Sequence, residues 1–123
     1  MPFINSLNTP ILQNTGDAVD KIARTVTGAS AWLDIGSARE LITQLDANAG
    51  TGTAPTLDVK LQTSYNGLDA TAVDVLTGAF TQVTAAASMQ IKSYSAFHRY
   101  VKIVWTITGT TPSFAFGVYL TSK

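Results

Sequence analysis

Residues 51–61 read TGTAPTLDVKL, and residues 108–118 read TGTTPSFAFGV. Each stretch begins with Thr-Gly-Thr-x-Pro and continues with apolar residues at every second position, the period of a half-buried β-strand. The Gly can adopt the positive φ of a tight turn, and the Pro suits a first strand position, where its missing N–H removes no ladder hydrogen bond. We therefore expect both copies to be hairpin corners that start equivalent strands in the two halves of one β-sandwich. Internal duplication and independent use of favourable turn residues explain the repeat about equally well.

Residues 99–108 form the strongest strand signal in the chain. One side of this strand would carry four large apolar residues: Val101, Ile103, Trp105 and Ile107. The opposite side is also fairly apolar, which is typical of a strand covered on both faces. We expect this segment to lie at the centre of the fold.

Residues 38–47, ARELITQLDA, are compatible with two structures. An extended conformation would place four residues on one face: Leu41, Thr43, Leu45 and Ala47. A helix would instead gather the larger apolar residues into one stripe. The strand at 57–61 requires an antiparallel neighbour. Residues 38–47 precede it at hairpin distance, which favours a strand over a helix for them.

The remaining segments have less regular patterns. Residues 21–26 favour a weak strand over a helix across 17–25, because the segment is short and ends in β-prone residues. After an Asn-Gly turn, residues 68–80 can form one short helical turn or a loop with an edge strand. Residues 80–84 and 88–92 are expected to pair as a hairpin.

Together these patterns predict an all-β fold, an antiparallel β-sandwich that resembles a jelly roll. We expect the sandwich to occupy residues 21–123 and to follow an extended arm of residues 1–20, where prolines and asparagines interrupt any period. The core is expected to contain five large aromatic residues: Trp32, Phe80, Trp105, Phe114 and Phe116.

Composition restricts the possible partners. Only 13% of the residues are charged, and eight Lys and Arg balance eight Asp and Glu without clustering, so neither nucleic acid nor a membrane surface is an expected partner. No cysteine is present, which excludes a disulfide framework and a thiolate nucleophile. The start of the chain has neither a basic region nor a long apolar run, so a cleaved export signal and a membrane span are not expected.

No residue pattern predicts an enzyme, a metal site or a cofactor site. His98 is the only histidine, and a loop or interface role is favoured for it over metal ligation or general base catalysis. Asp17 with Asp20, and Asp69 with Asp74, lack the spacing of a calcium-binding loop and are interpreted as solvated turn carboxylates. We therefore expect neither catalysis nor a cofactor.

The order of motifs resembles a family of small β-sandwich proteins encoded near the major capsid gene of tailed bacteriophages. The resemblance covers residues 22–121 and rests on GTAPTLDV, an Asn-Gly turn, FTQVTAA, RYVKIVW and GTTPSF. Some members of that family are head decoration or cement proteins. The resemblance implies a virion protein, made in the host cytoplasm, that binds the major capsid protein on the outer surface of the head. It also implies a homo-oligomer, with a trimer as the expected state.

Two groups of residues are candidate contacts. Residues 1–16 of the arm have no charged side chain and carry apolar residues that would be unfavourable in water, so the arm is expected to bind a neighbouring copy or capsid protein through five residues: Phe3, Ile4, Leu7, Ile11 and Leu12. Tyr94, Phe97 and His98 form a possible ligand site or interface.

The alternative function is a carbohydrate-binding module displayed on the virion. Aromatic rings stack on sugars, and four aromatic residues could form such a platform: Tyr65, Tyr94, Phe97 and Tyr100. A location in the core or at strand ends explains the same residues more simply.

Overall fold

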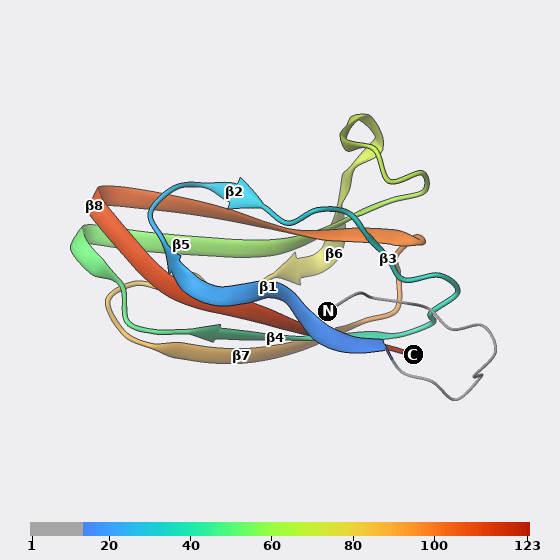
Figure 1. Ribbon diagram of the computed structural model, residues 1–123, viewed down its shortest axis with the longest axis horizontal. Helices are drawn as coiled ribbons and strands as arrows, with labels where there is room; N and C mark the ends of the chain where they lie inside the picture. Colours follow the sequence, from blue (N-terminus) through green and yellow to red (C-terminus); the bar gives the residue numbers. More distant parts are fainter. Residues whose placement is uncertain (1–13) are drawn as a thin grey trace.

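A computed structural model describes residues 14–123, and it confirms the predicted all-β, antiparallel fold (Figure 1). The strands are β1 (Asn14–Arg24), β2 (Gly28–Ala29), β3 (Leu33–Asp34), β4 (Leu41–Ala47), β5 (Thr51–Ser64), β6 (Val73–Ala79), β7 (Ser88–Tyr94) and β8 (Tyr100–Ser122). One short 3₁₀ turn, η1 (Asp69–Thr71), precedes β6. The predicted alternatives for 68–80 are both present, as a helical turn followed by an edge strand.

The strands form two layers that share β8. Sheet A has the order β1-β8-β4-β7 and uses the second half of β8, whereas sheet B contains β2 and β3 beside the first half of β8, followed by β5 and β6. In Figure 1 the layer of β4 and β7 lies below the layer of β5 and the first half of β8. β8 is central in both sheets, which confirms the central position predicted for residues 99–108.

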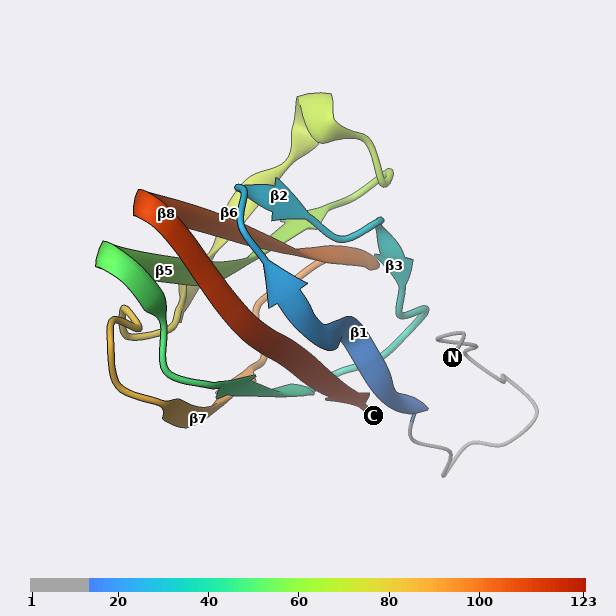
Figure 2. The same cartoon turned by 60° about the vertical axis from the view of Figure 1, so that its left-hand side comes forward.

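The two Thr-Gly-Thr-x-Pro copies pair with each other. Thr51 is opposite Ser113, Thr53 is opposite Thr110, and Thr56 is opposite Thr108. Each Pro lies in a register shift of this ladder, so its missing N–H leaves no regular pair unmade. The prediction that the copies are separate hairpin corners is therefore wrong: they are adjacent bends within β5 and β8. Figure 2 shows the two strands bending together at one end of the molecule.

The two bends have nearly the same backbone conformation. Gly52 and Gly109 have φ of 104° and 123°, and Ala54 and Thr111 have φ of 48° and 47°. A Cβ on Gly52 would lie 2.5 Å from the carbonyl oxygen of Thr111, and a Cβ on Gly109 would lie 2.9 Å from that of Ala54. Glycine is therefore required at both positions by backbone conformation and by close approach of the partner strand.

Alternating residues of the two sheets form one core. In β4 the buried residues are the four that the extended pattern predicts, Leu41, Thr43, Leu45 and Ala47. The reason given for that strand is wrong, however, because β8 lies between β4 and β5, which do not pair. The least accessible large side chains of the core come from both layers: Ile35, Leu41, Leu45, Leu57, Leu61, Ile103, Phe114, Phe116 and Leu120.

Two other sequence predictions differ from the structure. β1 already pairs with β8 at Asn14. The boundary predicted between the arm and the sandwich, at residues 20 and 21, therefore falls inside a strand of the sandwich. Residues 80–83 lie beside β5 in sheet B, where backbone hydrogen bonds join Val83 to Leu57. β7, in contrast, pairs with β4 in sheet A. The predicted hairpin of 80–84 with 88–92 is therefore wrong.

A side chain links the two layers where β7 passes residues 80–83. Gln90 accepts a hydrogen bond from the backbone N–H of Thr81 and donates one to its carbonyl oxygen, both at 2.8 Å. The side-chain amide of Gln90 thus forms, across the gap between the sheets, the two backbone hydrogen bonds that a residue of a neighbouring strand would form. This contact gives the sandwich its nearly barrel-like closure.

Candidate interaction surface

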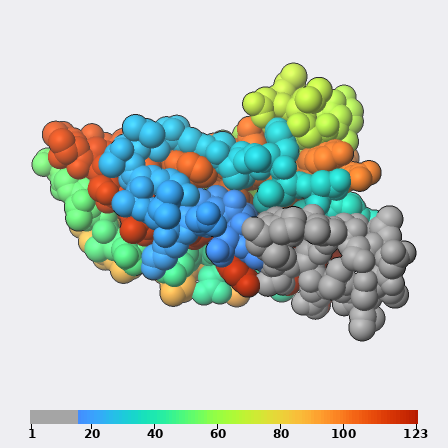
Figure 3. All heavy atoms as spheres, in the orientation of Figure 1, coloured from blue at the N-terminus to red at the C-terminus, as the bar shows by residue number. Residues whose placement is uncertain are grey.

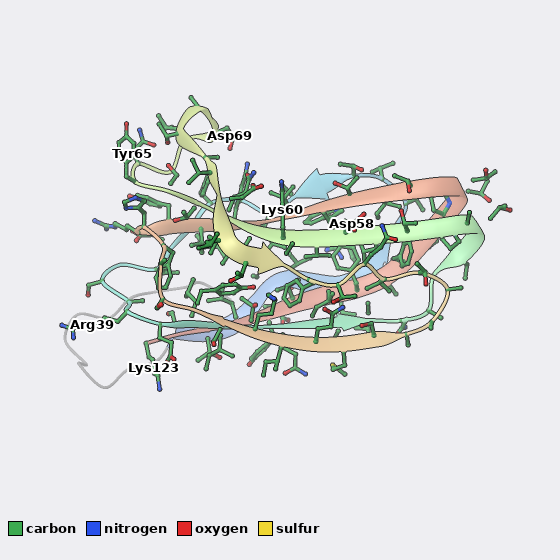
Figure 4. The ribbon with its side chains drawn as sticks, turned by 180° about the vertical axis from the view of Figure 1, so that it is seen from behind. Arg39, Asp58, Lys60, Tyr65, Asp69 and Lys123 are labelled. Atoms are coloured by element: carbon green, nitrogen blue, oxygen red, sulfur yellow. The ribbon has the colours of Figure 1, made fainter. Side chains whose placement is uncertain are left out.

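The outward side of sheet A carries large apolar side chains. Gln44 is paired with Tyr119 on one side and with Ile91 on the other, and Asp46 is paired with Met89. We call these five residues the sheet A face. Tyr119, Met89 and Ile91 are 47%, 63% and 67% exposed. Figure 4 shows side chains of this layer projecting away from the core.

β7 has an inverted pattern of burial. Its polar residues Gln90 and Lys92 are paired with the buried Leu45 and Thr43, so they lie on the inner side of the sheet. Met89 and Ile91 consequently point outward. A one-residue change of register would bury these apolar residues, so the observed arrangement leaves an apolar outer surface that a partner can cover.

A hollow lies beside Tyr119 on the sheet A face. Gly117 faces outward there, and a Cβ on it would lie 2.9 Å from both the backbone N of Lys21 and the carbonyl oxygen of Val19. The missing side chain lets the bulged part of β1 approach β8 closely. The hollow has a volume of about 330 Å³, and its polar lining is Asp17, Lys21, Gln44 and Asp46. Lys21 and Asp46 form an ion pair of 3.1 Å across it.

The structure separates the three residues predicted as a ligand site or interface. Tyr94 is 5% exposed and belongs to the core, where the hydroxyl of Thr43 donates a hydrogen bond of 3.3 Å to its oxygen. Burial raises the pKa of Tyr94. Phe97 packs partly buried against the core, and His98 is exposed. The ring of His98 meets the exposed Tyr65 edge-on at 6.4 Å, so only this end of the predicted group faces solvent.

Trp32 belongs to a surface cluster, so the prediction that it is part of the core is wrong. Its indole N–H donates to Asp69 Oδ1 at 2.8 Å, and the ammonium of Lys102 lies 4.9 Å from its ring and 2.8 Å from the same carboxylate oxygen. The hydrogen bond from Lys102, followed by that from Trp32, lowers the pKa of Asp69. Figure 3 shows the segment around η1 as a protruding knob, which these contacts attach to sheet B.

Two of the four acidic residues considered for calcium, Asp69 and Asp74, bind other side chains. Asp69 is bound by Lys102 and Trp32, and Asp74 accepts hydrogen bonds from Gln62 and Lys60, which lower its pKa. In the described part of the chain, no three His, Asp or Glu residues lie close enough together to hold a metal ion. No helix among residues 14–123 has the length and apolar character needed to cross a membrane.

Sequence reasoning missed the sheet A face because it assumes that the apolar residues of an alternating strand point inward. Met89 and Ile91 alternate with Gln90 and Lys92, and only the pairing with β4 shows which set is outside. The predicted contacts of the arm, Phe3, Ile4, Leu7, Ile11 and Leu12, lie outside the described residues. No protein-family model matches this sequence, and no curated protein is significantly similar to it.

Proposed function

We propose that this chain is a structural virion protein, a decoration or cement protein that binds the outer surface of a tailed-phage head. Its partners are the major capsid protein and further copies of itself, with a trimer as the expected assembly. The observation that supports this function best is the inverted burial of β7, which presents Met89 and Ile91 to a partner. The motif order described above supplies the virion context.

The chemistry of the sheet A face suits a protein partner. Full burial of a large apolar side chain contributes about 1.5–3 kcal/mol, and three side chains on this face are about half to two thirds exposed, so a partner that covers them gains a corresponding part of that energy from each. The ion pair of Lys21 with Asp46 neutralises two of the three charged side chains beside them, and Asp17 is the third. A neutral chain also repels its own copies only weakly, which favours assembly at the high local density of a capsid surface.

Binding to heads tests this function directly. Purified full-length protein is mixed with heads of the encoding phage that lack it, and the bound copies are counted after sedimentation. We expect saturable binding with a fixed number of copies per head. Met89→Lys/Ile91→Lys should reduce occupancy at least tenfold, whereas Leu76→Lys, which changes an apolar residue 80% exposed on β6, should not. Absence of wild-type binding would reject the function.

Carbohydrate binding is the second candidate, and the hollow beside Tyr119 favours it. An exposed aromatic ring flanked by Asp17 and Gln44 can stack on a sugar and bond its hydroxyl groups. Affinity electrophoresis in gels that contain host surface polysaccharide provides the test. Retardation of the wild type that Tyr119→Ala abolishes would support this function, and equal mobility in gels with and without polysaccharide would exclude it.

A further inference from the structure

β7 is an edge strand of sheet A, although its Gln90 side chain bonds the backbone of Thr81 across the gap between the layers. Among residues 14–123 it pairs with β4 alone, and the seven pairs of that ladder follow one another without a register shift. An edge strand exposes backbone N–H and C=O groups that can pair with another chain. β7 contains no proline, and its single charged residue, Lys92, lies on the inner side, where it is the one side chain of this strand that disfavours the addition of another strand.

The other edges carry the features that normally prevent such pairing. β1 has two register shifts, and β2 and β3 contain two residues each. β6 has a register shift opposite β5 and an exposed ion pair between Lys60 and Asp74. Bulges, very short strands and charges all disfavour the addition of a strand. β7 is therefore the edge on which a further strand fits best.

The sequence before β1 provides a strand of suitable length and chemistry. Residues 1–13 contain no charged side chain, and the stretch between Pro2 and Pro10 is FINSLNT, residues 3–9. This stretch has seven residues, as does β7. In an extended conformation Phe3 and Leu7 would project to the same side, since side chains on one side recur at every second residue.

Geometry favours the β7 edge of another copy over that of the same copy. Asn14 pairs with Ser122, Ser122 with Leu41, and Leu41 with Tyr94, so β1 and β7 are three strand spacings apart in one row. A strand beyond β7 would be four spacings from β1, or about 19 Å. Residues 9 and 14 are five steps apart and span at most about 18 Å. Within one copy, residues 10–13 would have to be nearly fully extended to reach this edge, so the edge of another copy is favoured.

We propose that residues 3–9 of one copy add as a strand to the β7 edge of a second copy, with Phe3 and Leu7 on the same side of sheet A as Met89 and Ile91 and in contact with them as direct or diagonal neighbours. Main-chain hydrogen bonds would supply affinity, and the apolar contacts with Met89 and Ile91 would fix which side of the added strand lies on the outer side of sheet A. The inference rests on the homo-oligomer of the proposed function and gives it an interface. Capsid binding is not needed for it.

Disulfide trapping tests this contact in the full-length chain, which has no cysteine of its own. A tagged Leu7→Cys protein is mixed with Ile91→Cys or Met89→Cys protein under mild oxidation, and the cross-linked heterodimer is measured on non-reducing gels. Leu7→Cys with Leu76→Cys is the matched control, because Leu76 is as exposed but lies on β6. We expect at least tenfold more heterodimer with one of the β7 variants than with the control.

Equal yields for the β7 variants and the control would overturn the proposal. An intrachain disulfide as the main product of a Leu7→Cys/Ile91→Cys double variant, identified by peptide mass mapping, would also overturn it. Head binding tests the capsid role separately from the interface between copies. Normal binding without cross-linking rejects only the interface, whereas efficient cross-linking without binding supports the interface and rejects the capsid role.

Discussion

Gly52 and Gly109 determine how closely β5 and β8 approach at the bend. Each faces the backbone of the partner motif, and each has a φ that disfavours any residue with a Cβ. The sequence indicates both glycines, because each stands in a Thr-Gly-Thr-x-Pro motif. It does not indicate that the motifs face each other, since pairing between segments so distant along the chain depends on the whole sheet.

Gly109→Ala should destabilise the protein by at least about 1–3 kcal/mol, because the backbone is strained for alanine and the new Cβ meets Ala54. Chemical denaturation followed by circular dichroism measures this loss. Thr110→Ala, at the neighbouring exposed position, should change the free energy of unfolding by less than about 0.5 kcal/mol. Equal stability of Gly109→Ala and wild type would refute the structure of the bend.

The carboxylate of Asp34 receives two hydrogen bonds from Arg99, of 2.8 and 2.9 Å, and one from the backbone N–H of Gly36. The bonds from Arg99 contribute most to lowering the pKa of Asp34 below its ordinary value of 3.8. Because the folded-state pKa is the lower one, the resulting stability is present above pH 3.8 and is lost as the pH falls through the folded pKa.

Arg99→Gln should therefore raise the pKa of Asp34, measured by NMR titration of its carboxyl carbon. The stability difference between wild type and variant should be largest near neutral pH and should shrink in acid. Arg39→Gln is a suitable control, since it changes another exposed arginine. An unchanged titration of Asp34 in Arg99→Gln would show that the ion pair is not formed in solution.

Among the elements, β7 differs most from what its sequence indicates. Its alternating pattern correctly predicts a strand, but the apolar residues face solvent and Gln90 faces inward. Sequence periodicity identifies the two sides of a strand without saying which of them is buried. β4 shows the converse, because its periodicity predicts the buried side although the expected pairing with β5 does not occur.

Gln90→Ala should open the contact between β7 and residues 80–83. The variant loses both hydrogen bonds to the backbone of Thr81. We expect the amide of Thr81 to exchange with deuterium at least tenfold faster, while amides in the centre of β8 keep their protection. Gln82→Ala is the control, as it removes a neighbouring amide that bonds Asp58. Unchanged exchange at Thr81 would contradict the role of Gln90 as a bridge between layers.

In the whole molecule, β8 connects the two sheets covalently and supplies buried residues to both. The all-β class and much of the core follow from the sequence, because the apolar residues of β4, β5 and β8 alternate regularly. The surface location of Trp32 does not, since it depends on Asp69 and Lys102 from distant segments. The sheet A face likewise depends on tertiary pairing.

A single core should give cooperative unfolding. Leu45→Ala, at a fully buried position in sheet A, should cost about 2–5 kcal/mol. Hydrogen exchange should show the same loss of protection in the central strands of sheet A and sheet B, because β8 belongs to both. Loss confined to sheet A would mean that the two layers unfold separately. Ile42→Ala, at a less buried position on the same strand, provides the comparison.

An electron cryomicroscopy reconstruction of the intact phage head tests the central claim that this protein works by assembly through sheet A. The account predicts density for the sandwich on the outer surface of the shell, with Met89 and Ile91 covered by a neighbouring protein chain. Absence of the protein from the shell would contradict the proposed function. A bound sandwich whose sheet A face points into solvent would contradict the proposed interface.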